Sequence, residues 1–273
     1  MGLVFACIAP HGGIAIAEAC VPAELDLAAA TRRGMEELGR RFDRAAPDVT
    51  VVLTPHNVHV EGAMAVITSG TVAGDLEGHP DLALRTPVDR TLALAIKDGI
   101  AADGIPITGV SYGANDAAAS TFPMDWAILV PIWFMGGRRA VPVPVVVVVP
   151  ARDLPYERHV AAGRAIARAA EASGKRVALI ASCDHGHGHD ATGPYGFTPR
   201  SREFDEQVVA LVNKDDLGGL LRMDPTLPVE GKADSYWQML MLHGALGGGW
   251  RGELLSYEAP TYYGMLCAAY AKS

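Results

Sequence analysis

The feature that most constrains the fold is a set of short, continuous, β-branched apolar runs separated by alanine-rich stretches with helical spacing. Strands that a sheet buries on both faces have this pattern, because no residue of such a strand meets water. The runs are Leu3 to Ala9, Val49 to Thr54, Ala63 to Ser69, Val143 to Val149 and Arg176 to Ser182. The helical stretches are Ala23 to Ala45, Val88 to Asp103, Tyr156 to Ser173 and Ser201 to Asn213.

This alternation predicts an α/β fold with a mostly parallel or mixed central sheet and helices on both faces. The run from Ala63 follows the run from Val49 too closely for a crossover helix, which favours a mixed sheet. No linker or repeat divides the 273 residues, so we expect one domain over residues 1–273. Glycine, aspartate and proline punctuate Thr71 to Thr86, and we predict a surface loop there, with a second long loop from Cys183 to Arg200.

Composition excludes several classes of function. The formal net charge of -8 disfavours binding to nucleic acid and to anionic membranes. The longest apolar stretch, Val141 to Pro150, is too short to span a bilayer, and the first residues lack the basic start of a signal peptide. The four cysteines form no CxxC pair, which favours reduced thiols and a cytoplasmic protein.

Histidines cluster where three of the predicted strands end. His11 follows the first strand, and His56, with His59 three residues later, follows the second. A third strand is followed by His185, His187 and His189. Ligands of α/β sheets bind beyond the carboxyl ends of the strands, and imidazole is a common metal ligand. The pattern therefore predicts a metal or catalytic site at this edge of the sheet.

A less specific interpretation also fits these residues. A single histidine after a strand is usually a solvated residue, and the alternating HGHGH run suits an exposed loop that binds metal only adventitiously. Three separate strand ends make coincidence a weaker explanation than it is for one. We interpret His79, His159 and His243 as surface or packing residues, because none of them follows a predicted strand.

Six segments together resemble class III extradiol ring-cleavage dioxygenases, specifically the catalytic subunit of the protocatechuate 4,5-dioxygenase type. In chain order they are IAPHGG, VVLTPHNVHVEG, FPMDWAILVPIWFMGG, ASCDHGHGHDATGPYGF with the following EFD, SYWQMLMLHGAL, and YEAPTYYGMLCAAY. No single motif decides the resemblance, which rests on their order and spacing over nearly the whole chain.

The resemblance implies an Fe(II) ion held by two histidines and one carboxylate, with open positions for substrate and dioxygen. Carried over by residue, His11 and His56 become metal ligands, and His59 is the alternative to His56. His187 becomes the acid/base histidine. Counting back from the EFD segment selects His189 instead, and both remain candidates.

The chain departs from the family pattern at two positions. Ser235 stands where the family has its glutamate ligand, so the third ligand is Asp234, Glu230 or none. Trp126 stands where family members have a mid-chain histidine that acts on substrate or oxygen. Tryptophan stacks on aromatic rings and donates one hydrogen bond, but it cannot shuttle protons. We expect Trp126 and Tyr195 to form walls of the substrate pocket.

The resemblance implies an Fe(II)-dependent extradiol dioxygenase that cleaves a small catechol-like or aminophenol-like aromatic with dioxygen. One alternative is a non-oxygenase of the same fold, similar to the mediator-of-cell-motility family, which also lacks the usual carboxylate. Another is a zinc hydrolase that uses His11, His56 and a loop histidine. A third is a subunit that works only in a larger assembly. Apolar C-terminal segments are compatible with a homodimer.

Overall fold

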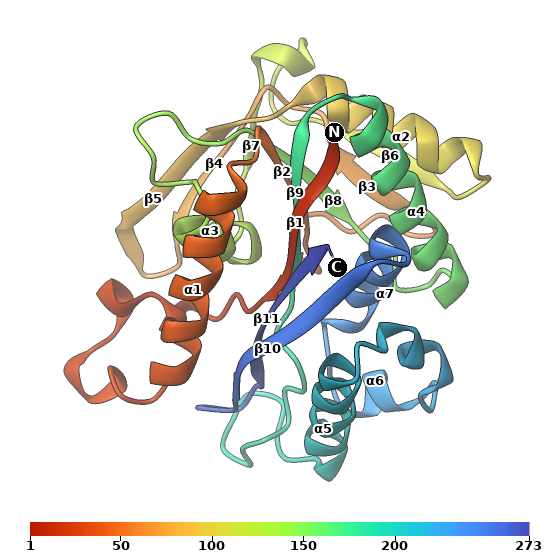
Figure 1. Ribbon diagram of the computed structural model, residues 1–273. Helices are drawn as coiled ribbons and strands as arrows, with labels where there is room; N and C mark the ends of the chain where they lie inside the picture. Colours follow the sequence, from red (N-terminus) through yellow and green to blue (C-terminus); the bar gives the residue numbers. More distant parts are fainter. Residues whose placement is uncertain (273) are drawn as a thin grey trace.

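A mixed eight-stranded sheet runs through the centre of the computed structural model, which describes residues 1–272 (Figure 1). In spatial order its strands are β10 (Trp250–Glu258), β11 (Met265–Lys272), β1 (Gly2–Ala9), β9 (Arg176–Ser182), β2 (Val49–Leu53), β8 (Val145–Val149), β3 (Met64–Ile67) and β6 (Ile107–Val110). The central strands β1, β9, β2 and β8 are parallel, whereas β11 and β3 join them antiparallel. The predicted mixed sheet is confirmed.

The central strands form where the sequence predicts them because nearly all of their side chains avoid water. All residues of β2 and β8 are buried, and β8 is a run of five valines. Such strands are stable only when helices cover both faces of the sheet. β1 and β2 lie on opposite sides of β9, which brings the carboxyl ends of all three strands to one edge.

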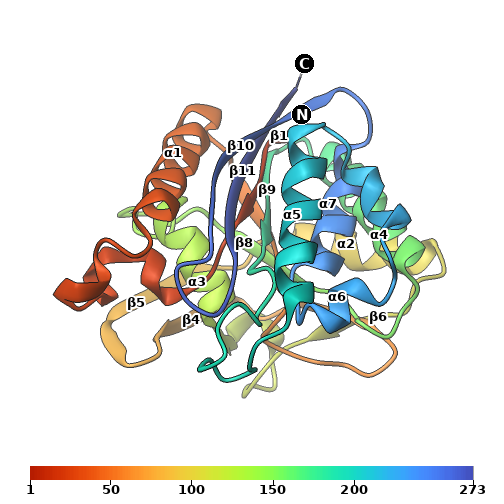
Figure 2. The ribbon, with the colours of Figure 1, turned by 90° about the horizontal axis from the view of Figure 1, so that it is seen from below.

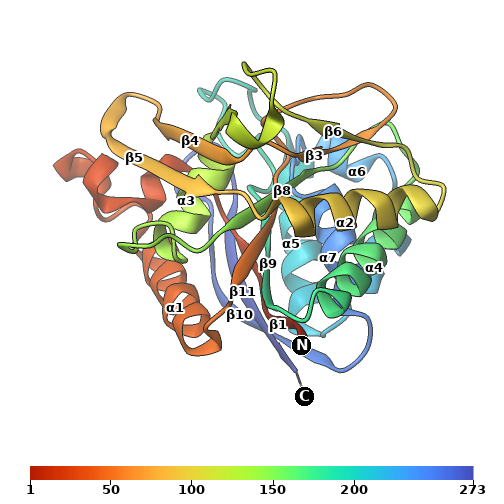
Figure 3. The same cartoon turned by 90° about the horizontal axis from the view of Figure 1, so that it is seen from above.

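Helices cover both faces of the sheet, as the sequence predicts (Figure 2, Figure 3). On one face lie α1 (Ala29–Ala45) and α3 (Trp126–Phe134). On the other lie α2 (Arg90–Ala102), α4 (Tyr156–Ala172), α5 (Pro199–Asn213), the short α6 (Leu227–Glu230) and α7 (Tyr236–Leu246). Within the described part of the chain, no helix combines the length and apolar composition that crossing a bilayer requires.

Two glycines let the backbones of α4 and α7 touch. A Cβ at Gly163 of α4 would lie 1.9 Å from the Met241 carbonyl oxygen of α7. Conversely, a Cβ at Gly244 of α7 would lie 2.0 Å from the Val160 carbonyl oxygen of α4. No side chain fits at either position without moving one helix away from the other. This contact fixes α7, whose first turn lies at the carboxyl-end edge of the sheet.

The predicted surface loop at Thr71 to Thr86 is wrong. This segment forms β4 (Thr71–Leu76) and β5 (His79–Pro87), which pair with β7 (Thr121–Pro123) in a second sheet. Val72, Leu76 and Leu84 are buried in it. The glycine that suggested a loop, Gly78, occupies only the tight turn, where its φ of +78° favours glycine.

Candidate metal centre

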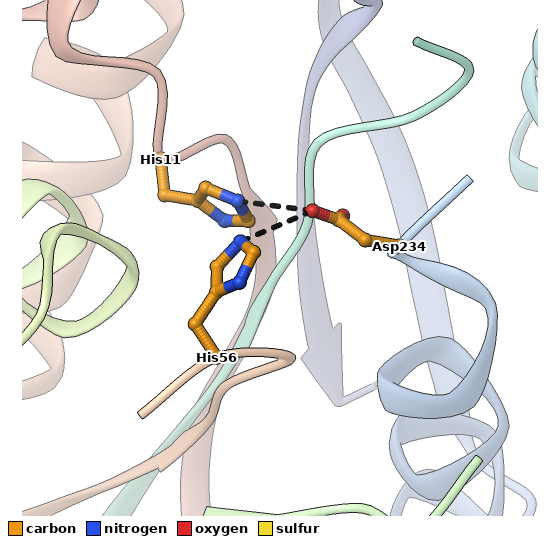
Figure 4. A group of neighbouring side chains, drawn as sticks. All are labelled: His11, His56 and Asp234. Carbon is orange, nitrogen blue, oxygen red and sulfur yellow. Dashed lines mark ion pairs between the residues drawn. The ribbon is translucent and has the colours of Figure 1, made fainter. Parts of the chain in front are cut away.

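Three side chains from distant parts of the chain meet at the carboxyl-end edge of the sheet. His11 follows β1, His56 follows β2, and Asp234 immediately precedes the first turn of α7 (Figure 4). Nε2 of His11 lies 3.4 Å from Asp234 Oδ2, and Nε2 of His56 lies 3.3 Å from the same oxygen. One ligand atom from each of the three residues lies within 4.8 Å of the others, so a single metal ion can contact all three.

The hydrogen bonds of His11 fix its tautomer. The Ser182 hydroxyl donates to the Ala127 carbonyl oxygen at 2.6 Å, so it has no second proton to give. His11 Nδ1 lies 3.0 Å from the same hydroxyl and must therefore donate to it. Nδ1 carries a proton, and Nε2 turns toward Asp234. Metal-bound imidazoles are oriented in this way, by a hydrogen bond through the ring nitrogen that does not bind the ion.

Asp184, which was not predicted as a site residue, also contacts His11. Its Oδ1 accepts the backbone N–H of His11 at 3.0 Å, and its Oδ2 lies 3.6 Å from His11 Nε2. The side chain is buried. The available signal was its position, because Asp184 lies two residues beyond the end of β9, at the same sheet edge as the histidines.

The buried carboxylates and imidazoles perturb one another. Burial by itself would lower the pKa of His11, but the carboxylates of Asp184 and Asp234 raise it to about 9. Burial raises the pKa of Asp234, but the His11, His56 and His187 rings more than offset burial and hold this pKa well below its ordinary value. Asp234 is therefore a carboxylate, and the cluster favours a positive charge between its members.

The two candidate acid/base histidines face different partners. His187 Nδ1 lies 3.0 Å from the Lys232 carbonyl oxygen, which only accepts, so Nδ1 carries the proton. The other ring nitrogen, Nε2, faces the centre, 3.9 Å from Asp234 Oδ2. His189 Nε2 instead donates to the buried carboxylate of Asp205 at 2.8 Å. Asp205 also accepts from the Tyr257 hydroxyl, so His189 belongs to a network beside the cluster.

The other candidate ligands lie outside the cluster. His59 is exposed, and within residues 1–272 it is not part of any group that could share an ion with His11. The carboxylate of Glu230 pairs with the Arg200 guanidinium at 2.8 Å. Ser235 is fully buried, and its hydroxyl lies 2.9 Å from Nδ1 of His185. It is not part of the cluster of His11, His56 and Asp234.

Two cavities, of about 570 and 610 Å³, adjoin the cluster, and His56, His187 and Tyr195 line both. Trp126 lines the first cavity, and its ring lies 4.8 Å from that of His56. The Tyr195 ring stands perpendicular to His187 at 5.7 Å. The structure thus places both expected wall residues at the cavities.

The first cavity also has wall residues that the sequence analysis missed. Tyr263 stacks on His187, with ring centroids 5.5 Å apart and an interplanar angle of 24°. Glu77, in the turn between β4 and β5, and His79, the first residue of β5, line the same cavity. His79 was interpreted as a surface or packing residue because no predicted strand precedes it, and the hairpin that carries it was not predicted.

Comparisons with known proteins give matches over most of the chain. A family model described as the catalytic LigB subunit of aromatic ring-opening dioxygenase matches residues 5–267. A curated protein of Clostridium acetobutylicum, Protein CA_C1420, is 20% identical over 232 residues, which are 84% of this chain. The match covers 49% of that protein, so the chain spans about half the length of this relative.

A solved structure shares the fold. The crystal structure of the uncharacterized protein JW3007 from Escherichia coli K12 matches with a TM-score of 0.64 and 19% sequence identity. The match covers 98% of this chain and 99% of that one. At this identity the likeness extends to the architecture alone.

Proposed function

The chain belongs to the family of the catalytic LigB subunit of aromatic ring-opening dioxygenases, and on this premise we propose that it is an Fe(II)-dependent extradiol dioxygenase. Its proposed substrate is a small catechol-like or aminophenol-like aromatic, which it opens with dioxygen, as in the protocatechuate 4,5-dioxygenase type. The observation that carries the proposal is the convergence of His11 and His56 on Asp234, with the free nitrogen of His187 3.9 Å from the same carboxylate.

The donor set fits a non-haem divalent ion. Two imidazoles and one carboxylate are the ligands of Fe(II) sites that keep positions open for substrate and dioxygen. The Oδ1 atom of Asp234 is buried without a partner among the described residues, as expected of an oxygen intended for a cation. A bound ion would lower the pKa of a substrate hydroxyl that coordinates it and would bring substrate and dioxygen together.

His187 supports the acid/base part of the proposal. Its protonated Nδ1 is held by the Lys232 carbonyl oxygen, which leaves Nε2 able to take a proton from a substrate hydroxyl and to return it later. The Lys232 side chain in turn donates to the Tyr195 carbonyl oxygen, so the two segments that hold His187 are joined. General acid/base transfer by a positioned histidine contributes about 10² to 10⁴ in rate.

The cavity walls support a flat aromatic substrate. Tyr263 stacks on the His187 ring, and Tyr195 contacts the same ring edge-on. Trp126 contacts His56. Aromatic rings packed in this way offer both faces and edges to a further ring. Trp126 binds and orients such a ring, but every proton transfer falls to His187 because the indole N–H does not titrate.

The test is turnover after loading the protein with Fe(II) under anaerobic conditions. Addition of oxygenated buffer with a panel of catechols and aminophenols should give the absorbance of a ring-opened product. Product should depend on both Fe(II) and oxygen, and Asp234→Ala is the matched control. Stoichiometric iron without product from any substrate would contradict dioxygenase activity.

The same donor set gives a zinc hydrolase some support, because two histidines and a carboxylate also hold catalytic zinc. The two functions differ in their need for oxygen, because only the dioxygenase consumes it. Zn(II)-loaded protein should be inert toward the aromatic panel in air, and Fe(II)-loaded protein should be inert without oxygen. Hydrolysis of model esters or amides by the Zn(II) form, with no oxygen-dependent reaction of the Fe(II) form, would favour the hydrolase.

A further inference from the structure

The segment that leaves β9 contacts the metal centre with one set of side chains and α7 with the other. Ser182 and Asp184 contact His11, as described above. The alternate residues, Cys183 and His185, turn to the start of α7. The Cys183 thiol lies 3.7 Å from the Ser235 carbonyl oxygen, and His185 Nδ1 lies 2.9 Å from the Ser235 hydroxyl. Alternation of this kind is inherent in an extended chain.

Ser235 is the N-cap residue of α7, but its hydroxyl does not cap the helix. An N-cap serine usually accepts a hydrogen bond from a backbone N–H in the first turn. Here the hydroxyl bonds to His185, and both side chains are fully buried. The position where the family resemblance expects a glutamate ligand is therefore used to hold α7 to the segment after β9.

The carboxylate of Asp234, the adjacent residue, accepts few hydrogen bonds that could orient it. Its Oδ2 contacts only imidazoles, and no group within residues 1–272 donates to its Oδ1. Carboxylate ligands are usually oriented by additional hydrogen bonds. Since none is found, the place of the Asp234 carboxylate depends on the backbone that carries it, and Ser235 is the next residue of that backbone.

We propose that the buried hydrogen bond between His185 and Ser235 positions Asp234 for metal binding. The pair acts through Asp234 and touches neither ion nor substrate, so both are positioning residues. This inference rests on the proposed metal centre. It explains how a shorter carboxylate, one residue before the expected ligand, reaches the two histidines: Ser235 turns to His185, and Asp234 turns to His11 and His56.

The test is the affinity of the whole chain for Co(II), whose visible spectrum also reports the ligand geometry. Ser235→Ala should raise the dissociation constant about 10- to 100-fold, the usual effect of losing a group that orients a ligand. Ser235→Thr keeps the hydroxyl and should restore most of the affinity. Ser120→Ala is the matched control, because it removes a buried hydroxyl, bonded to Ser69 at 2.7 Å, outside the centre.

A second variant tests the partner. His185→Asn keeps a hydrogen-bonding atom near the place of Nδ1 and should bind Co(II) more tightly than His185→Leu. If the two residues act as a pair, the double variant Ser235→Ala with His185→Leu should lose no more affinity than His185→Leu alone. The comparison of His185→Asn with His185→Leu remains informative even if Ser235→Ala folds poorly.

The outcomes separate this inference from the proposed function. Wild-type affinity and an unchanged Co(II) spectrum in folded Ser235→Ala would overturn the positioning role and leave the metal centre intact. Absence of Co(II) binding to the wild-type chain would overturn both. A weakened and spectrally altered site in Ser235→Ala, with recovery in Ser235→Thr, would support the inference.

Discussion

Asp234 is the residue on which the proposed metal centre most depends, because both histidines converge on one of its oxygens. Asp234→Ala should raise the metal dissociation constant by more than about 100-fold, since loss of a ligand exceeds the usual cost of losing its support. Glu230→Ala is the matched control, and it also tests the other candidate carboxylate. Equilibrium binding of Fe(II) without oxygen measures both, and a larger loss from Glu230→Ala would contradict this assignment.

Substitution of His187 should change the rate of ring cleavage, whereas substitution of His189 should change the stability of the fold. His187→Gln should lower single-turnover ring cleavage about 10²- to 10⁴-fold with unchanged iron content, because it removes the proposed acid/base nitrogen near Asp234. His189→Gln should lower the free energy of unfolding by about 1–3 kcal/mol, because it disturbs the donor to buried Asp205. Rapid mixing and urea titration measure the two effects, and the reverse pattern would identify His189 as the acid/base.

At the level of secondary-structure elements, the contact between α4 and α7 is the most sensitive feature. Gly163→Ala should destabilise the fold by about 1–3 kcal/mol, because its Cβ would collide with the Met241 carbonyl oxygen. The displaced α7 should also weaken metal binding through Asp234. Gly99→Ala in α2 is the control, since the nearest atoms to its Cβ are 3.9 Å away.

Gly99→Ala should therefore stabilise α2 by about 0.5–1 kcal/mol, the helix preference of alanine over glycine. Urea unfolding of both variants supplies the comparison. Equal effects of the two substitutions would show that the close approach of α4 and α7 is not what limits position 163.

The elements that the sequence predicted well are those whose pattern has a single local cause. Val145 to Val149 can be little else than a buried strand, and α4 begins and ends within one residue of its predicted range. The hairpin of β4 and β5 was missed because the glycine, aspartate and proline residues of Thr71 to Thr86 suggested a loop. β10, which alternates partly buried and exposed residues, has no continuous apolar run and was not predicted.

The candidate site was predictable only in part for a similar reason. His11 and His56 follow strands, and the direction of parallel strands brings them together. Asp234 came only from the family resemblance, because nothing local marks it. The choice between His187 and His189 depends on Asp205 and Lys232, which are distant in sequence and contact these histidines only in the folded chain.

For the whole molecule, buried His159 should make stability depend on pH. Burial lowers the pKa of His159 from 6.5 to about 4. Between pH 6.5 and pH 4 the unfolded chain binds a proton at His159 that the folded chain excludes. The contribution of neutral His159 to the free energy of unfolding is therefore complete above pH 6.5 and is lost as the pH falls toward 4. The loss amounts to about 3 kcal/mol at 1.36 kcal/mol per pH unit.

The measurement is urea unfolding from pH 7 to pH 4 for the wild type and His159→Leu. The difference between the two curves isolates His159, and the variant should have the flatter dependence. His59→Gln, at an exposed histidine, is the control. Parallel curves for the wild type and His159→Leu would show that His159 is not the group responsible.

The wide spacing of the three converging residues along the chain has a consequence for protein synthesis. His11 and His56 leave the ribosome well before Asp234 and before β11, which pairs with β1. A growing chain therefore cannot complete the proposed centre until Asp234 has emerged, and capture of an ion by all three residues must follow that point. From then on the ion favours the finished fold, by about 2.7 kcal/mol when its free concentration is 100 times its dissociation constant. If that ion is the proposed Fe(II), iron supply would control how long the protein persists in the cell.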